Sequence, residues 1–347
     1  MTNTFDLFMT DDQLQSILKT GAVPGGGGNI ELVETHISWV ILTSDFAFKL
    51  KKPLTLGFLD FSTLEKRHFF CQEELRLNRR LAPEMYLDVL PVGIVDGEVT
   101  IGAAGVAPID YALQMRRMDN QLQMDKLLAD GAVTRQHMVQ LAEVLVPFHQ
   151  SVLLPDSKSF HPAALWSDFA DLFRFSADIV QQLGAHTSTK LAHWRDYLPA
   201  FLEKHSERLL ERRRDGFWVD GHGDLHTRNI FLTKKGPAVF DCIEFSTHYR
   251  QSDILNELAF LCMDLEAQGH AELADVFLQG YTRRWNVFPK NEDHHLFLFF
   301  KAYRANVRLK IALLALRQHP TKDMIEQVRQ YWQLMAAYLD QLDLEEL

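Results

Sequence analysis

The hydrophobic pattern of the chain changes at about residue 119, and this change limits the folds that the chain can adopt. Before that point, short runs rich in β-branched and aromatic residues alternate with polar turns, as strands do. After it, apolar residues recur at spacings of three and four, which is typical of amphipathic helices. A globular chain of 347 residues, 47% of them apolar, is long enough for two lobes. We therefore expect an α+β protein with a sheet-containing N-terminal lobe and a larger, mainly helical C-terminal lobe.

The expected elements follow from this periodicity. Strands are expected at 30–33, 39–42, 47–50, 86–91, 92–95, 98–101, 109–115, 218–220, 230–232 and 238–240. Helices are expected at 11–20, 62–81, 134–153, 165–183, 194–214, 252–265, 271–285, 294–316 and 324–342. Ser62 and Glu65 have the spacing of a capping box at the start of the second helix. Gly25–Gly28 resemble a linker, because no Gly-Lys-Ser/Thr follows them as it would in a phosphate-binding loop.

The charge and composition of the chain argue against some classes of binding partner. The formal net charge is −10, whereas a nucleic-acid or anionic-membrane partner asks for a basic face. The three cysteines are few and lie in apolar surroundings, which favours reduced thiols in a cytoplasmic protein. The N-terminus lacks the basic segment of a signal peptide, and no apolar run approaches the length of a membrane span. We expect a cytoplasmic protein that binds neither nucleic acid nor membrane; the oligomeric state is not readable.

One polar segment interrupts the helical region, and it carries the strongest chemical pattern. Asp224 is followed five residues later by Asn229 and, after a short hairpin, by Asp241. A carboxylate such as Asp224 can orient and deprotonate a hydroxyl. The oxygens of Asn229 and Asp241 are ligands that Mg²⁺ prefers, and the hairpin lets both point at one ion. This layout predicts phosphoryl transfer from ATP with Mg²⁺ as cofactor.

This segment also has a structural interpretation and a zinc-binding interpretation. Asp224 could be a structural residue that caps a turn after Gly223. Alternatively His222, Asp224 and His226 could share one face of a strand and bind zinc, but Asn229 would then have no role. We prefer to assign His222 and His226 to hydrogen bonds that brace the loop.

Lys49 is the candidate that would pair with the nucleotide phosphates. It shares one face of the third expected strand with Ala47 and Lys51. A glutamate from the next helix should position it, and Glu74 fits the helical row better than Glu73 does. Lys51 and the adjacent Lys52 remain alternatives to Lys49.

Three further groups of residues are candidates for contacts with the nucleotide or the acceptor. Met115 lies in the stretch 114–118, an extended connector between lobes that could offer backbone groups to the base of a nucleotide. The turn between the first two strands contains His36 and Ser38, which could contact phosphates. Arg304 and Arg308 lie with Lys301 on one face of a late helix and could bind an anionic acceptor, although pairing with acidic residues of neighbouring helices is favoured.

These motifs resemble the aminoglycoside phosphotransferase family, and in particular a bacterial branch of uncharacterised members. The resemblance runs from about residue 30 to 315. It is carried by the segments 222–230, 35–40, 48–53, 57–61, 77–83, 241–245 and 303–308. The chain has Asp-Cys-Ile at position 241, where protein kinases have Asp-Phe-Gly.

The resemblance implies a two-lobed protein-kinase-like fold with an N-terminal antiparallel sheet, one helix, and a helical C-terminal lobe. It also implies that Asp224 is the base, that Asn229 and Asp241 hold Mg²⁺, and that Lys49 pairs with phosphates. We expect an N-terminal helix and linker at 1–28, a nucleotide-binding lobe at 29–113, a hinge at 114–118 and a helical lobe with the catalytic loop at 119–347.

The expected activity is transfer of the γ-phosphate of ATP or GTP to a hydroxyl group of a small molecule. One alternative is a catalytically silent nucleotide-binding protein, although none of the expected catalytic groups is missing. Another is a protein Ser/Thr kinase, but Ser246 and Thr247 are followed so closely by a helix that little room remains for an activation segment. The identity of the acceptor and the preference between ATP and GTP are not readable.

Overall fold

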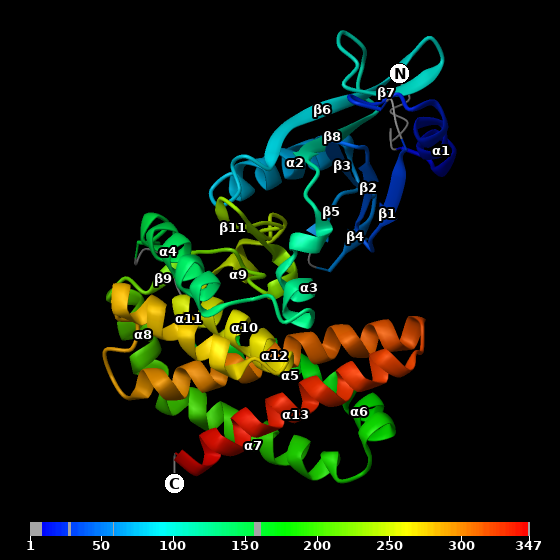
Figure 1. Ribbon diagram of the computed structural model, residues 1–347. Helices are drawn as coiled ribbons and strands as arrows, with labels where there is room; N and C mark the ends of the chain where they lie inside the picture. Colours follow the sequence, from blue (N-terminus) through cyan, green and yellow to red (C-terminus); the bar gives the residue numbers. More distant parts are fainter. Residues whose placement is uncertain (1–8, 27–28, 58, 156–160, 346–347) are drawn as a thin grey trace. The chain divides into compact units, whose positions relative to one another are not determined.

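The structure is a computed structural model that describes residues 9–26, 29–57, 59–155 and 161–345. Contacts divide the chain into two compact units. The first unit comprises Met1–Leu127, Asn229–Lys234 and Ala238–Tyr249, and the second comprises Leu128–Arg228, Lys235–Pro237 and Arg250–Leu347. Figure 1 shows the elements coloured along the sequence. The boundaries expected from the sequence, with a hinge at 114–118, remain a prediction.

The first unit contains a six-stranded sheet in the order β1-β2-β3-β8-β6-β7, with antiparallel neighbours throughout. Its strands are β1 (Glu31–Glu34), β2 (Ser38–Leu42), β3 (Phe46–Lys51), β6 (Tyr86–Val95), β7 (Glu98–Ile101) and β8 (Asp110–Arg116). The helices are α1 (Asp11–Thr20) and α2 (Leu64–Asn78), and β4 (Thr55–Leu56) pairs with β5 (Leu59–Asp60). Residues 86–91 and 92–95, expected as two strands, form one.

Successive residues of β3 point to opposite faces of this sheet. Phe48 and Leu50 belong to a core cluster that also contains Leu14 and Ile17 of α1. Ala47 belongs to a second cluster with Tyr86, Met115, Leu75 of α2 and Phe231. This alternation places Lys49, which lies between Phe48 and Leu50, on the same face as Ala47.

The N-terminal cap of α2 differs from the expected one. The hydroxyl of Thr63 accepts the Lys66 N–H, so Thr63 is the cap and Ser62 is not. The N–H and hydroxyl of Ser62 instead donate to Asp60. Since Ser62 and Thr63 are both good caps, the local sequence could not distinguish them.

The second unit is mainly helical. Its helices include α4 (Arg135–Ser151), α5 (Ala163–Ala170), α6 (Ser176–Leu183), α7 (Thr187–Lys204), α8 (Ser206–Arg214), α10 (Ile254–Ala267), α11 (Ala271–Arg284), α12 (Glu292–Gln318) and α13 (Lys322–Glu345). The short helices α3 (Met124–Ala129) and α9 (Thr247–Arg250) each span a boundary between the units. None of the helices in the described ranges is both long and apolar enough to cross a lipid bilayer.

Two of the expected helices are interrupted. The segment expected at 165–183 is split into α5, a 3₁₀ segment (Asp171–Phe175) and α6. The segment expected at 194–214 begins earlier, at Thr187, and breaks at His205. Apolar spacing of three and four continues through these breaks, so the periodicity alone did not indicate them.

Helix α10 is buried almost throughout and packs against α11 and α12. It begins at Asp253, whose carboxylate accepts the Leu255 N–H and pairs with Arg212 at 2.7 and 2.8 Å. The preceding residues form β12 (Gln251–Asp253), which pairs with β9 (Trp218–Asp220). The polar sequence of β12 gave no strand signal, and residue 252 was wrongly expected to begin the helix. Together, these contacts fix α10 beside the chain that follows β9.

Candidate active site

The loop after β9 is held by a buried carboxylate of α10. Glu257 accepts the backbone N–H of His222 at 2.8 Å and that of Gly223 at 2.7 Å. A Cβ atom on Gly221 would lie only 2.7 Å from the Glu257 carboxyl carbon, so this close approach requires glycine. Burial acts to raise the pKa of Glu257, but attraction to His149, His222 and Arg304 lowers it to about 2. Glu257 is therefore ionised at neutral pH.

The far end of the same loop is held by a second carboxylate, which lies further along α10 on the same face. Asp264 accepts the backbone N–H of Thr227 at 2.9 Å and its hydroxyl at 2.6 Å. Asp264 lies seven residues after Glu257, which is about two helical turns on the same face. The two carboxylates thus fix both ends of the loop that carries Asp224.

Within the loop, two histidines position Asp224. The Nε2 atom of His226 lies 3.2 Å from Asp224 Oδ2, while its Nδ1 atom accepts the Arg228 N–H at 3.3 Å. Because Nδ1 accepts a hydrogen bond, His226 donates to Asp224 from Nε2. The N–H of Asp224 donates to His222 Nδ1 at 3.3 Å. These contacts match the bracing role expected for His222 and His226.

Asp224 combines an accessible carboxylate with a strong preference for the charged form. Its side chain is 36% exposed. Burial of the group opposes ionisation, but attraction and a hydrogen bond from His226, with His222 and Arg308 contributing, hold the pKa of Asp224 below its usual range. Such a group accepts a hydrogen bond from a ligand hydroxyl at neutral pH.

The zinc interpretation fits this geometry poorly. The Nδ1 atoms of His222 and His226 accept backbone N–H groups, and His226 Nε2 faces Asp224. Within the described parts of the chain, no three histidine, cysteine or acidic side chains are grouped so as to hold a metal ion.

In the first unit, Lys49 contacts two carboxylates. Its Nζ atom lies 2.7 Å from Glu74 Oε1 and 2.8 Å from Asp241 Oδ1. Glu74 is fully buried, whereas Glu73 pairs with Arg76, so Glu74 is the glutamate that positions Lys49. Burial acts to lower the pKa of Lys49, but Asp241 and Glu74 raise it well above its usual value. The lysine is charged and its exposed neighbour is Asp241.

Asn229 and Asp241 are brought together by the hairpin of β10 (Ile230–Thr233) and β11 (Gly236–Val239). Asn229 directly precedes β10, and its carbonyl accepts the Phe240 N–H at 2.9 Å. β11 begins at Gly236, two residues before the strand expected at 238–240.

Asp241 follows this hairpin in a left-handed conformation with φ 62°. Its N–H donates to the Tyr86 hydroxyl at 3.1 Å, and the next N–H, of Cys242, donates to Asn78 Oδ1 at 2.8 Å. The Asp241 side chain is 46% exposed, and only one of its oxygens contacts Lys49. An exposed carboxylate is a type of ligand that Mg²⁺ takes, and the metal-binding role of Asn229 and Asp241 stays a prediction.

The predicted nucleotide contacts at Met115, Ser38 and His36 differ in accessibility. Met115 is buried in the cluster that contains Ala47 and Phe231. Ser38 lies opposite Lys51 in the sheet register and is fully buried. His36 is exposed in the turn between β1 and β2.

The row Lys301, Arg304 and Arg308 on α12 makes internal contacts. Lys301 pairs with Glu266 at 2.7 Å. Arg304 is buried and donates to Asn256 Oδ1 at 2.7 Å and to the Gly223 carbonyl at 3.0 Å. Arg308 donates to the Tyr331 hydroxyl at 3.4 Å. Internal partners were expected for this row, but the expected ones were acidic residues, and Arg304 instead holds the loop backbone.

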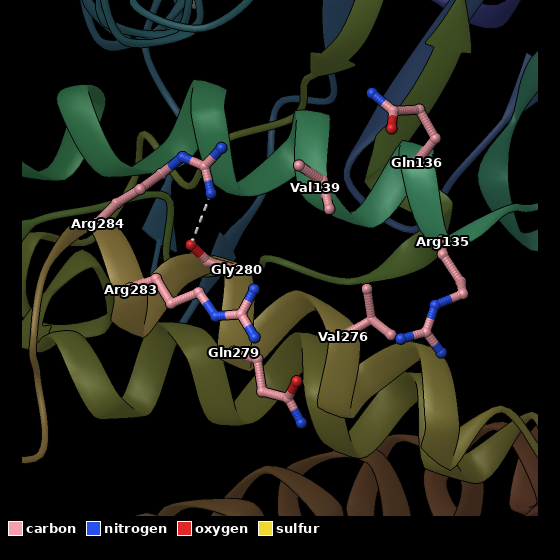
Figure 2. Close-up of a pocket in the computed structure, with 8 residues that line it drawn as sticks. All are labelled: Arg135, Gln136, Val139, Val276, Gln279, Gly280, Arg283 and Arg284. Atoms are coloured by element: carbon pink, nitrogen blue, oxygen red, sulfur yellow. Dashed lines mark hydrogen bonds between the residues drawn. The ribbon is translucent and has the colours of Figure 1, made fainter.

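A pocket of about 330 Å³ lies between α4 and α11 in the second unit. Figure 2 shows its lining, which includes Arg135, Arg283 and Arg284, with Arg284 donating to the Gly280 carbonyl at 2.9 Å. None of the residues predicted from the sequence lines this pocket.

Sequence reasoning did not assign Glu257 or Asp264 to the loop. The sequence predicted only that acidic residues of neighbouring helices pair with the basic row on α12. The spacing of seven residues between Glu257 and Asp264 on an otherwise apolar helix is a signal that could have marked them, because buried carboxylates require partners.

Comparison with known proteins identifies the family of this chain. Residues 70–290 match the model of a family described as the phosphotransferase enzyme family. An uncharacterized protein of Mycobacterium tuberculosis strain H37Rv is 32% identical over 306 residues. The alignment covers 86% of this chain, and the chain spans about 58% of the length of that relative.

Among solved structures, a choline kinase from Cryptosporidium parvum Iowa II has a TM-score of 0.53 at 12% identity, covering 95% of this chain and 97% of the other. A GDP and kanamycin complex of the aminoglycoside phosphotransferase APH(2")-IIia has a TM-score of 0.50 at 12% identity, covering 96% and 99%. These likenesses confirm the predicted kinase-like α+β fold class. The predicted family resemblance is confirmed by the family match, and the chain belongs to the phosphotransferase enzyme family.

Proposed function

We propose that this protein transfers the γ-phosphate of ATP or GTP to a hydroxyl group of a small molecule, with Mg²⁺ as cofactor. The observation that carries the proposal is the contact of Lys49 with both Glu74 and the exposed Asp241. A buried glutamate that orients a lysine toward an exposed carboxylate presents one cation and one metal ligand to the phosphates of a nucleotide.

The residues of the first unit would bind the nucleotide. Lys49 would exchange its contact with Asp241 for phosphate oxygens and keep its contact with Glu74. Asp241 and Asn229 would hold Mg²⁺, which supplies positive charge to the phosphates when bound. The cluster of Ala47, Met115 and Phe231 lies on the same face as Lys49 and would supply the apolar surface for the base.

The loop of the second unit would supply the base. Asp224 would accept a hydrogen bond from the acceptor hydroxyl, orient it, and take its proton late in the transfer. A low pKa suits this role, because phosphoryl transfer is mainly a matter of positioning and charge. Arg304 would hold the loop backbone, and Arg308, whose charge attracts Asp224, remains a candidate contact for the acceptor.

The proposed class of acceptor is supported by the structural neighbours. The structural neighbours include a choline kinase and an aminoglycoside phosphotransferase solved with GDP and kanamycin, which supports a small hydroxyl compound and leaves both nucleotides open. A catalytically silent protein is disfavoured, because Asp224, Asn229, Asp241 and Lys49 are all present.

The test is a transfer assay with nucleotide labelled on its γ-phosphate and a library of hydroxyl-bearing metabolites. The parent should label one class of compound, and Asp224→Asn should lower turnover by on the order of a thousandfold or more while still binding nucleotide. Equal rates for the two proteins would remove Asp224 from its role. Labelling of protein substrates alone would favour the protein-kinase alternative.

A further inference from the structure

A second buried lysine lies beside Lys49. Lys51 is two residues further along β3 and therefore on the same face of the sheet. Its Nζ atom lies 2.7 Å from Glu74 Oε2 and also contacts Glu244 Oε1. Glu74 thus holds Lys49 with one carboxylate oxygen and Lys51 with the other.

These side chains form a linear series of ionic contacts. The order is Asp241, Lys49, Glu74, Lys51 and Glu244, and Glu244 follows Asp241 by three residues on the same segment. The series is exposed to solvent at the Asp241 end and buried at the Glu244 end. The Asp241 side chain is 46% exposed, whereas those of Lys51 and Glu244 are 1% and 5% exposed.

Stability alone does not account for the burial of Lys51 and Glu244. Burying a lysine and a carboxylate costs hydration energy, and well-packed apolar residues often stabilise a fold as much as the pair does. A buried ion pair does, however, fix the direction of its partners. Here it ties the segment after Asp241 to β3, independently of Lys49.

The contact between Lys51 and Glu244 becomes important when a nucleotide binds, because it does not depend on Lys49. In the structure, Asp241 is held through its side chain by Lys49 and through its backbone by Tyr86. When Lys49 turns to the phosphates, the side-chain contact is lost. Lys51 and Glu244 have no open face toward a ligand and can keep the segment in place.

We propose that Lys51 and Glu244 are positioning residues that hold Asp241 in its metal-binding orientation while Lys49 moves to the nucleotide. The inference rests on the proposed function and deepens it, since it adds a support that acts on the metal through Asp241. Loss of this support would weaken the Mg²⁺-dependent part of nucleotide binding and leave the metal-independent part unchanged.

The experiment measures the rise in melting temperature caused by ATP while Mg²⁺ is titrated. Lys51→Met and the milder Glu244→Gln should each raise the Mg²⁺ concentration that gives half of the full rise in melting temperature. The increase should be about tenfold or more, which is a common result of removing support from a metal ligand. Lys51→Arg, which keeps the charge, should recover most of the parent response. The shift caused by ATP without Mg²⁺ should be the same in all variants.

The matched control is the buried ion pair of Arg67 and Asp110 in the same unit, with both side chains fully buried and an Nε–Oδ1 distance of 2.9 Å. Arg67→Met should lower the melting temperature but keep the parent requirement for Mg²⁺. The inference is overturned if Lys51→Met and Glu244→Gln keep that requirement too, or if Arg67→Met changes it equally. A parent protein that does not respond to ATP with Mg²⁺ would instead overturn the proposed function, and this inference with it.

Discussion

Replacing Glu257 with glutamine tests whether one buried carboxylate holds the loop that carries Asp224. The carboxylate accepts two backbone N–H groups, from His222 and Gly223. A glutamine has one carbonyl oxygen, so it can accept one of these donors and must present its NH₂ group to the other. The change keeps the volume of the side chain and removes one acceptor and one charge.

The expected cost can be estimated in two ways. Leaving a buried donor without an acceptor costs about 1–3 kcal/mol, and the remaining hydrogen bond loses the strength that the charge gave it. The fall in the pKa of Glu257 from 4.5 to about 2 corresponds to roughly 3 kcal/mol, at about 1.4 kcal/mol for each pH unit. Glu257→Gln should therefore lower the free energy of unfolding by about 3 kcal/mol at neutral pH.

The pH dependence gives a second signature. Because the folded-state pKa is lowered, the stabilisation from Glu257 is complete above its usual pKa of 4.5 and disappears as the pH falls toward about 2. About 1 kcal/mol of it should be lost by about pH 4. The difference between parent and variant should shrink by that amount, as measured by urea unfolding at both pH values.

Hydrogen exchange of the amides of His222 and Gly223 provides the local measurement, and both should exchange faster in the variant. Glu203, an exposed glutamate of α7, offers a matched control, and Glu203→Gln should change neither stability nor exchange. The reasoning fails if Glu257→Gln is as stable as the parent at pH 7, or if its loop amides remain equally protected.

Three further perturbations follow from the same contacts. Gly221→Ala should cost about 1–3 kcal/mol in urea unfolding because its Cβ would overlap the Glu257 carboxyl group, and an unchanged midpoint would contradict this. Asp253→Asn should cost about 3 kcal/mol, since it removes one of the two carboxylates that pair with the buried Arg212 guanidinium and leaves only Asp293, whereas a loss below about 1 kcal/mol would show that the pair is dispensable. Lys49→Met should raise the KM or dissociation constant for ATP with Mg²⁺, measured by calorimetry, and unchanged affinity would exclude Lys49 as the phosphate contact.

The sequence predicted those parts of the site that depend on local pattern. Lys49 and Glu74 could be paired because strand alternation and a helical row determine which faces they occupy. Asn229 and Asp241 could be paired because a short hairpin separates them. In the structure Lys49 contacts Glu74, and the carbonyl of Asn229 accepts the N–H of Phe240, the residue before Asp241.

The contacts that sequence reasoning missed depend on approach between distant segments. Glu257 reaches the loop only because α10 packs beside the chain after β9, and no local pattern encodes that approach. Lys51 was treated as a competitor of Lys49, whereas the structure gives both lysines a place on one glutamate. Helix interruptions were missed because apolar spacing continues through them.

The central claim is that Asp241 and Asn229 hold a divalent ion on a nucleotide that Lys49 contacts. Binding of Mn²⁺, detected by electron paramagnetic resonance with and without ATP, measures this most directly. Mn²⁺ should bind the parent tightly only when ATP is present, and Asp241→Asn should lose that binding while remaining folded. A parent that binds no Mn²⁺ with ATP, or an Asp241→Asn variant that binds it as the parent does, would contradict the account.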